Sequence, residues 1–478
     1  MSTVPAIEAL KQVLPTDQLY FEGTEEFDKI NGSYLSALEN DITPAVIVLP
    51  KTTKDVSTFL VTIRPFAASG EMAFAIRGAG QQPLPGCANI QGGLTLDLHL
   101  LTGIDLDLDT GIVSIAAGER WGAVYEKLHD RGLAVTGSRS AKGGIGGLAL
   151  SGGLSFFSSR DGLICDNVVS YEIVLASGEV VKCSADDHQD LWKALRGGGN
   201  NFGIVTRYSM RTFKQGPFWG GSVFYYPASF PGQIDALVQQ LHNSEAETHI
   251  MISLFFAAQF GQPMGLNQLY YTREVESPPV LDPFAKVQPQ LDQLNSMRMI
   301  NLKDAAAEQA AMAMEGVRCA YMNTTVKADA ATLKAAAEAF SSSLDHVKGF
   351  EGVVFSLTFQ PYPVSLLERC ISAGGNVTGL TPTTGPLVSI LVLMNWKNKN
   401  DDSQILAAGK ALLSTIEADS AVRGQAVAYK YMNYAFNFQD PIGSYGPENK
   451  SLLREVSKKY DPDGIFQKGV PGGFKLFV

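Results

Sequence analysis

Short apolar runs between polar turns predict a strand, a helix and a second strand near the start of the chain. Residues 45–49 (AVIVL) are β-branched or aliphatic and predict a buried strand. Thr52 with Asp55 resembles a capping box, and an amphipathic helical pattern continues over 56–63. Residues 74–76 predict the second strand, which leads directly into a glycine-containing loop. This order of elements is α/β in character.

The rest of the first half alternates strand-like and helical segments and is rich in glycine. A long hairpin after Asn167 turns at Ser177-Gly178, and a short helix over 190–195 stops at Gly197. The further predicted elements are strands over 94–98, 112–116 and 202–210 and a helix over 121–129.

From about residue 213 glycine becomes sparse, and strands alternate with alanine-rich helices. This pattern predicts an antiparallel sheet covered by helices on one face, the α+β layout. From Ala428 the composition is loop-rich again and is expected to rejoin the first part. We therefore expect an α+β protein in which 1–212 and 425–478 form one domain and 213–424 another. The predicted strands of the middle part cover 220–226, 250–257, 267–271, 353–359 and 387–395, and its predicted helices cover 234–242, 330–341 and 405–416.

The bulk properties agree with a folded protein and exclude several classes. The chain has 478 residues, 45% of them hydrophobic and 18% charged, which is too long for one ordinary core and too apolar for disorder. Its formal net charge of −10 repels phosphate backbones, so nucleic acid is not an expected partner. There is no signal-peptide pattern at the N-terminus and no apolar run of bilayer-spanning length. With five scattered cysteines, a reduced cytoplasmic protein without a membrane partner is expected.

Two glycine segments could carry chemistry. The loop Arg77-Gly78-Ala79-Gly80-Gln81-Gln82 follows a strand, and its amides could form a concave site for a pyrophosphate, with Arg77 adding charge or bracing the loop. A tight turn after a buried strand explains this loop equally well. The segment 143–153 (GGIGGLALSGG) is a stronger signal, because so many glycines are unfavourable unless the backbone approaches something closely. A glycine-lined packing contact between elements is the alternative.

The second segment is not interpreted as a dinucleotide fingerprint of the Rossmann type. Gly144, Gly146 and Ala149 match its spacing, and Asp166 follows about 20 residues later. However, Gly152-Gly153 would end the helix that the fingerprint must open, and 135–138 is a poor strand end. NAD is therefore not the expected cofactor.

Known catalytic constellations are missing from the chain. There is no GxSxG, HExxH or P-loop motif, and the six histidines do not show metal-ligand spacing, so no metal site is expected. Chemistry must then come largely from a cofactor, in agreement with the glycine segments.

Nearly the whole chain resembles an FAD-linked oxidase of the vanillyl-alcohol oxidase / p-cresol methylhydroxylase (PCMH) superfamily, in the berberine-bridge-enzyme-like branch. The stretches FAIRGAGQQPLPGCANIQGGLTLDL and GGIGGLALSGGLSFFSSRDGLICDNVVSYEIVLASGEVV resemble the two FAD loops of that family. AVIVLPKTTKDV, DLWKALRGGGNNFGIVTRY and the C-terminal YMNYAFNFQDPIGSYGPENKSLLREVSKKYDPDGIFQKGVPGGFKL also resemble family segments.

The resemblance implies a PCMH-type FAD domain, a substrate domain, and an isoalloxazine ring at their interface. The residues it assigns to FAD are Arg77, Gly78, Ala79, Gly80, Gln81, Gln82, Gly86, Ser140, Gly143, Gly144, Gly146, Gly147, Gly153, Leu154, Asp166, Asn167, Val168, Gly203, Ile204 and Val205.

One departure from the family concerns the covalent bond to flavin. Most relatives carry a histidine where this chain has Gln81, and many carry a cysteine just before the second glycine cluster, where this chain has 137–140 (GSRS). We therefore expect FAD to be bound non-covalently, which favours a milder oxidant or a role outside simple alcohol oxidation.

Substrate-side residues follow from the same resemblance. Asn433 could orient the substrate or bond the flavin, and Tyr431 could accept a proton if its pKa were lowered. Ordinary alternating strand residues are the competing interpretation. Tyr321, Gln360 and Asn376 are expected to line the substrate face, although a structural role explains each better than a catalytic one when it is taken singly.

Three functions remain open at the level of sequence. The first is an FAD-dependent oxidoreductase that oxidises a small secondary-metabolite-like substrate by hydride transfer to flavin, with molecular oxygen as acceptor; the middle part shows no obvious cationic clamp. The second is a redox-neutral cyclase or isomerase, such as a pericyclase, built on the same fold. The third is a non-enzymatic flavin or small-molecule binding protein.

Overall fold

The capped helix expected after Thr52 forms and covers a small sheet at the start of the chain. Helix α4 (Thr53–Ala68) begins with a reciprocal capping box between Thr52 and Asp55. Strands β2 (Val46–Val48), β4 (Leu94–Asp97) and β3 (Phe74–Arg77) pair in parallel in that order, and β1 (Leu19–Phe21) adds antiparallel to β2. The computed structural model describes residues 4–243 and 245–477. The other helices of this part are α1 (Val4–Val13), α2 (Glu25–Asn31) and α3 (Ala37–Asn40).

The part of the chain before the large middle sheet, which we call the first lobe, contains a second sheet. This sheet is antiparallel, and Tyr208 of its strand β10 contacts Gly146 of the second glycine segment. Its five strands have the order β5 (Ile104–Asp107), β6 (Ile112–Ala116), β10 (Ile204–Arg211), β8 (Val168–Val174) and β9 (Val180–Ser184). A short pair joins β7 (Leu133–Ala134) to β11 (Phe213–Lys214). The helices here are α5 (Trp121–His129), α6 (Ile145–Leu150), α7 (Ser158–Asp161) and α8 (Gln189–Leu195).

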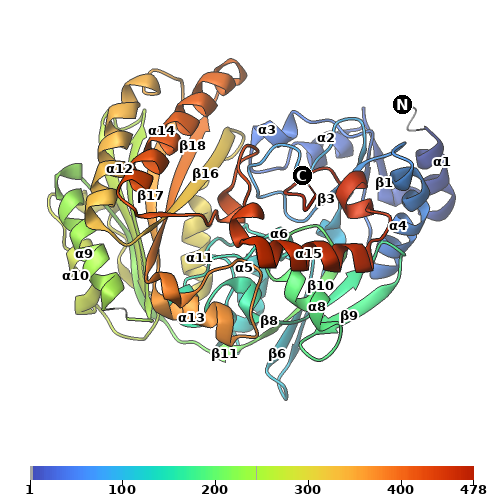
Figure 1. The fold of residues 1–478 in the computed structure, drawn as a ribbon, viewed down its shortest axis with the longest axis horizontal. Helices are drawn as coiled ribbons and strands as arrows, with labels where there is room; N and C mark the ends of the chain where they lie inside the picture. The colour runs from blue at the N-terminus through green and yellow to red at the C-terminus, as the bar shows by residue number, and fades with distance from the viewer. Residues whose placement is uncertain (1–3, 244, 478) are drawn as a thin grey trace.

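The middle of the chain forms an eight-stranded, fully antiparallel sheet with helices on one face, as expected. Helices α9 (Phe230–His242), α12 (Ala330–Ser343) and α14 (Asp402–Val422) lie on the outer side in Figure 1. Their apolar residues pack with alternate residues of the strands in one core. The strand order is β15 (Arg298–Ile300), β12 (Phe218–Tyr225), β14 (Pro263–Tyr271), β13 (Thr248–Ala257), β17 (Val354–Tyr362), β18 (Leu387–Trp396), β16 (Arg318–Lys327) and β19 (Ala426–Val427).

The last part of the chain returns to the first lobe. Helix α15 (Pro447–Tyr460) lies across that lobe beside α8 (Figure 1). Leu453, Phe466 and Leu476 are buried in the same core as the first-lobe strands. Helices α10 (Asp282–Ala285), α11 (Leu302–Ala311) and α13 (Val364–Ser372) complete the structure.

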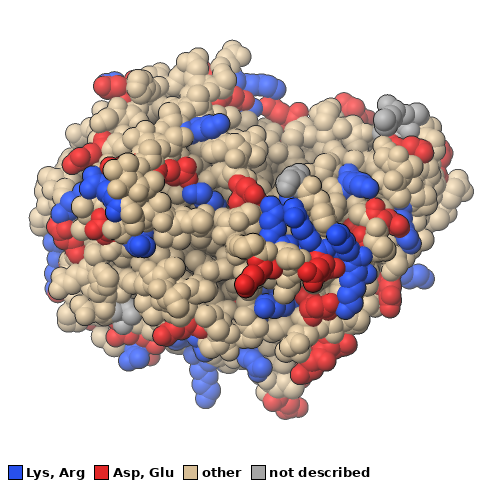
Figure 2. All heavy atoms as spheres, viewed as in Figure 1, with Lys and Arg blue, Asp and Glu red and all other residues tan. Residues whose placement is uncertain are grey.

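The surface and the helices agree with the bulk composition. Figure 2 shows acidic and basic side chains interspersed on the visible face. Among the residues that the structure describes, no helix combines the length and the apolar character needed to cross a bilayer.

Candidate functional site

The two glycine segments meet in the structure. A Cβ atom placed on Gly144 would lie 2.5 Å from the Cβ of Ala79, and one placed on Gly78 would lie 3.9 Å from the main-chain nitrogen of Gly147. Real Cβ atoms do not approach as closely as the first distance, so Gly144 lets the second segment rest on the first loop. The backbones of the two segments therefore approach each other closely.

The first loop presents main-chain donors without partners. Among the described residues, the amides of Ala79, Gly80, Gln81 and Gln82 donate to no acceptor. A Cβ atom on Gly147 would contact nothing within 4 Å, so open space adjoins the place where the segments meet. Consecutive free amides beside open space suit the oxygens of a diphosphate.

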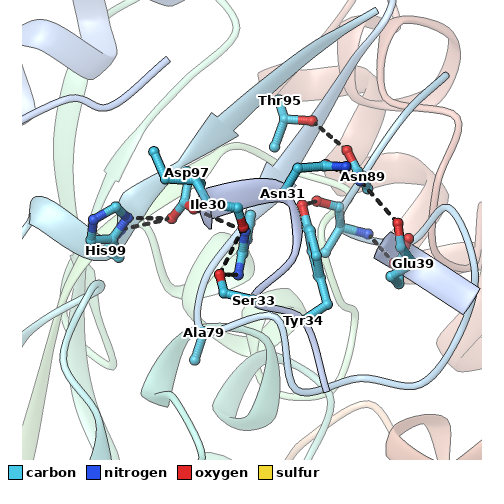
Figure 3. A network of polar contacts seen from close by, with 12 residues as sticks. Ile30, Asn31, Ser33, Tyr34, Glu39, Ala79, Asn89, Thr95, Asp97 and His99 are labelled. Carbon is cyan, nitrogen blue, oxygen red and sulfur yellow. Dashed lines mark hydrogen bonds and ion pairs between the residues drawn. The ribbon is translucent and has the colours of Figure 1, made fainter. Parts of the chain in front are cut away.

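Arg77 braces this loop and is not free to contact a ligand. Its guanidinium donates to the carbonyl of Ile30 at 2.8 Å and to the hydroxyl of Ser33 at 2.7 Å, and it lies 3.3 Å from the carboxylate of Asp97 (Figure 3). It also stacks on the ring of Tyr34, 3.7 Å from the ring centroid. Of the two roles expected for Arg77, the structure shows the bracing role.

A buried carboxylate holds the far end of the same loop. Glu39 is fully buried and accepts hydrogen bonds from the amides of Gly86 at 2.9 Å and Ala88 at 3.1 Å. Burial raises the pKa of Glu39, and these amides partly oppose that shift. Asn89 donates to Asn31 at 2.9 Å in the same network (Figure 3). The network fixes the backbone of the loop before any ligand is present.

Arg120, which the sequence did not single out, links the two glycine segments. Its guanidinium donates to the carbonyl of Ala79 at 3.3 Å and to that of Lys142 at 2.5 Å. No motif marks this arginine, which precedes α5 in an ordinary helical pattern. Only the fold places it between the segments.

The C-terminal return reaches the second glycine cluster through Asn433. Its side-chain oxygen accepts from the amide of Gly153 at 3.3 Å, and its nitrogen donates to the carbonyl of Leu148 at 3.5 Å. A Cβ atom on Gly152 would lie 3.6 Å from the ring of Tyr431. The two residues expected to be catalytic therefore lie against the cluster expected to hold flavin.

Three tyrosines form a cluster beside these contacts. The rings of Tyr431 and Tyr434 are 4.8 Å apart edge to face, and those of Tyr321 and Tyr434 are 5.7 Å apart. Asn323 on β16 holds the main chain of Tyr431 through hydrogen bonds of 2.8 and 3.0 Å. Burial raises the pKa of Tyr431 well above its usual value. A proton-accepting role for Tyr431 requires the opposite shift, so the burial of this tyrosine does not favour that role.

Arg139 is the second functional residue that the sequence did not indicate. Its guanidinium donates to Gln360 Oε1 at 3.0 Å and to Tyr434 Oη at 2.5 Å, and it contacts Met251 Sδ at 2.7 Å. Gln360 therefore lies beside Arg139 and Tyr434, and its substrate contact stays a prediction. The sequence of the middle part showed no obvious cationic clamp, and the cationic group at this position, Arg139, comes from the first lobe.

The side chains of Asp166 and Asn376 are hydrogen-bonded to each other. Asp166 is buried, lies 3.4 Å from the guanidinium of Arg196, and accepts from the amide of Leu163 at 2.9 Å. Burial raises the pKa of Asp166. Asn376 donates to Asp166 at 2.8 Å. The expected substrate contact of Asn376 is therefore corrected to a structural contact that joins 375–378 to the first lobe.

The remaining residues predicted to bind FAD lie next to the second glycine segment and at the start of two neighbouring strands, β8 and β10. The carbonyl of Ser140 accepts from the amide of Gly143 at 3.2 Å, and Asn167 donates to the carbonyls of Asp161 and Leu163. Leu154 is buried after the second cluster. Val168 begins β8, while Gly203, Ile204 and Val205 lie at the start of β10, its neighbour in the sheet.

An α+β fold in which two glycine segments meet beside free amides is the fold of an FAD-binding flavoprotein. A family model described as FAD binding domain matches residues 44–184. FAD-dependent monooxygenase FUP4 of Fusarium proliferatum is 35% identical over 459 residues, which are 93% of this chain and 87% of that protein. FAD-dependent monooxygenase tpcD of Cochliobolus heterostrophus is 36% identical over 464 residues, with 93% and 88% covered. The chain belongs to this family of FAD-dependent oxidoreductases and is an enzyme of that class.

Solved structures confirm the fold expected from the sequence. BBE-like 1 of Physcomitrella patens aligns with a TM-score of 0.79 at 19% identity and 99% coverage of both chains. Xylooligosaccharide oxidase from Myceliophthora thermophila aligns with a TM-score of 0.78 at 20% identity, covering 99% of this chain and all of that one. At this level of identity the likeness shows that the chain shares the fold of these proteins.

Proposed function

We propose that this enzyme binds FAD without a covalent bond and oxidises a small secondary-metabolite-like molecule by hydride transfer, with molecular oxygen as the acceptor. The observation that carries the proposal is the close approach of Gly144 to Ala79, the first of the four residues 79–82 whose amides are free. Names of the fungal relatives, which are FAD-dependent monooxygenases, support an oxidative role.

The proposed cofactor residues are those already predicted around the two segments. Ala79 to Gln82 would hold the diphosphate, Gly144 to Gly147 would lie against the rest of the cofactor, and Asn433 would fix the cluster behind it. Arg77 and Asp166 would act through the loops they brace. In the same proposal 1–212 and 425–478 form the FAD domain and 213–424 the substrate domain. One apolar core is made mostly of residues from the first two ranges and the other mostly of residues from 213–424, although Phe218, Tyr270 and Tyr362 of the middle range join the first core.

The absence of a covalent bond rests on the residues at the two tether positions. A glucooligosaccharide oxidase from Acremonium strictum, which carries a 6-S-cysteinyl, 8α-N1-histidyl FAD, aligns with a TM-score of 0.77 at 18% identity. Here Gln81 stands where relatives carry the histidine, and its amide bonds only the carbonyl of Ala79, at 3.4 Å. Ser140 lies in the stretch where relatives carry the cysteine. The amide of Gln81 and the hydroxyl of Ser140 replace the groups that bond flavin in those relatives, which supports non-covalent binding.

The chain's own residues would bind and orient the substrate. Bound FAD would supply the hydride acceptor. Tyr321 and Tyr434 present ring faces and edges that exclude water, and Gln360 offers an amide beside them. Asn433 would orient the reacting group, and Tyr431, which keeps its proton, would act as a hydrogen-bond donor.

A redox-neutral cyclase is the second candidate, and one observation favours it. Tyr431, the tyrosine expected to serve as base, has its pKa raised by burial, which does not suit proton abstraction.

Two measurements test the proposal. The purified protein should be yellow, and after acid precipitation the colour should remain in the supernatant; colour in the pellet would show a covalent bond. Anaerobic mixing with a panel of phenolic and polyketide-type compounds should bleach the flavin for at least one compound that is also turned over. Product formation without bleaching would replace the oxidase by the cyclase.

A further inference from the structure

The face of the large sheet that lies toward the first lobe carries a group of polar side chains among apolar ones, whereas the helix-covered face packs apolar side chains. Gln360 on β17 pairs with Ser389 on β18, which pairs with Thr325 on β16, so these three side chains form one row. His249 and Tyr362 follow on the same face, because side chains two residues apart along a strand share a face. A buried sheet face ordinarily packs apolar side chains, so a row of hydroxyl, amide and imidazole groups indicates a ligand surface.

Four polar atoms on this face lack partners. Among the described residues, His249 Nε2, Thr325 Oγ1, Tyr362 Oη and Ser389 Oγ are buried and make no hydrogen bond. A buried polar atom without a partner destabilises the folded protein, because it has lost its hydrogen bonds to water. Four of them on one face are better explained by groups that receive a bound molecule than by a packing accident.

Arg139 reaches this face from the first lobe with only neutral acceptors around it. Its contacts are Gln360 Oε1, Tyr434 Oη and Met251 Sδ, and no carboxylate among the described residues pairs with it. A thioether is a weak acceptor compared with the carboxylates that guanidinium groups usually find when buried. Arg139 therefore carries a charge that the protein itself leaves without a counter-ion.

We propose that Arg139 is the anchor for an anionic oxygen, a carboxylate or phenolate, on an aromatic substrate that lies along the polar face between Gln360 and the tyrosine cluster. The inference deepens the proposed function by naming the substrate class of the same site, and it rests on that function. Tyr321, Tyr434 and Arg139 are each partly exposed, so the position is open to a small molecule. Ring edges at T-shaped angles suit an aromatic body, and the planar guanidinium suits a carboxylate.

The test uses the FAD-loaded protein and two probes that differ only in charge. Benzoate and benzamide are titrated by calorimetry, and the same titrations are followed in the flavin absorption band. Wild-type protein should bind benzoate about tenfold more tightly than benzamide, the effect of one charge-assisted contact. Arg139→Met should remove that preference, and Arg139→Lys should keep part of it. Arg273→Met, which changes an exposed arginine of the middle part, is the matched control and should change nothing.

The outcomes separate this inference from the proposed function. Equal binding of the two probes to wild-type protein, or a full preference in Arg139→Met, would overturn the role of Arg139 even if the flavin is reduced by other compounds. If Arg139→Met does not fold, the preference for benzoate over benzamide is compared between wild-type protein and Arg139→Lys, and an equal preference in the two proteins would overturn the role of Arg139. Failure to take up FAD would instead remove the proposed function. Calorimetry without flavin would then still show whether the face prefers the anion.

Discussion

The side-chain oxygen of Asn433 accepts a hydrogen bond from the amide of Gly153, 280 positions earlier in the chain, at 3.3 Å. This bond joins the returning C-terminal segment to the second glycine cluster, and the Asn433 nitrogen adds a longer one to Leu148. The cluster is therefore held by a residue of the C-terminal segment that is next to Tyr434 in the chain.

Asn433→Ala should weaken FAD binding while leaving the fold intact. Loss of one hydrogen bond costs about 1 kcal/mol, so the dissociation constant should rise roughly fivefold. Flavin fluorescence during dilution measures it. Asn437→Ala changes an exposed asparagine of the same segment and should have no effect; equal effects of both variants would show that Asn433 does not hold the cluster.

Gly144→Ala should disrupt the contact between the glycine segments. The added Cβ would lie 2.5 Å from the Cβ of Ala79, an atom that cannot move without its backbone. We expect a loss of FAD affinity of roughly tenfold or more, the effect of about 1.4 kcal/mol. Gly232→Ala is the matched control, because a Cβ there meets nothing within 4 Å and the residue lies in α9. That variant should be stabilised by about 0.5–1 kcal/mol in urea unfolding. Unchanged flavin binding in Gly144→Ala would contradict the geometry of the site.

Arg196→Met should destabilise the protein strongly. The guanidinium of Arg196 is fully buried, pairs with Asp166 and donates to the carbonyl of Cys165 at 2.9 Å. Removing one partner of a buried ion pair costs about 3–5 kcal/mol, because the other is left buried without compensation. Arg64→Met breaks the pair with Asp463, whose side chains are 41% and 43% exposed, and should cost at most about 1 kcal/mol. Similar unfolding midpoints for the two variants would refute the difference.

Lys475 should make stability rise with pH above neutrality. Burial lowers the pKa of Lys475 to about 7 from its usual value of 10.5. Between these values the unfolded chain binds a proton that the folded chain does not, so raising the pH through this window stabilises the fold. Below pH 7 both states are protonated, and the contribution is constant. The urea midpoint of wild-type protein should increase from pH 7 to pH 9 relative to that of Lys475→Met. Parallel pH curves for the two proteins would show that Lys475 titrates normally.

Local patterns predicted most elements, but they did not predict the partners of the site. The capping box at Thr52, the hairpin at Ser177-Gly178 and the alternation of the middle strands depend on near neighbours and were predicted correctly. The family resemblance assigned both glycine segments to FAD, but the approach of Gly78 to Gly147 is seen only in the structure. Arg120 and Arg139 were missed, because nothing in their immediate sequence distinguishes a guanidinium that spans two segments from one on a surface.

Asn376 shows why the role of a single residue is hard to predict from its immediate sequence. A polar residue in a loop near a substrate face is compatible with either contact. Only the position of Asp166, far away in sequence, decides that its amide is used inside the protein. The direction of the Tyr431 pKa likewise depends on burial by segments from both lobes.

The position of Arg139 on one lobe and of Gln360 and Met251 on the other has a consequence for engineering. In a chimera, residues 213–424 could be exchanged for the corresponding part of a relative. Its large sheet would then carry different hydroxyl and amide side chains, but Arg139 would be unchanged. The chimera would then keep the preference for an acidic substrate, because it keeps Arg139. Recognition of the other polar groups of the substrate would change, because residues 213–424 would come from the relative. Redesign of this enzyme for a neutral compound should therefore begin at residue 139.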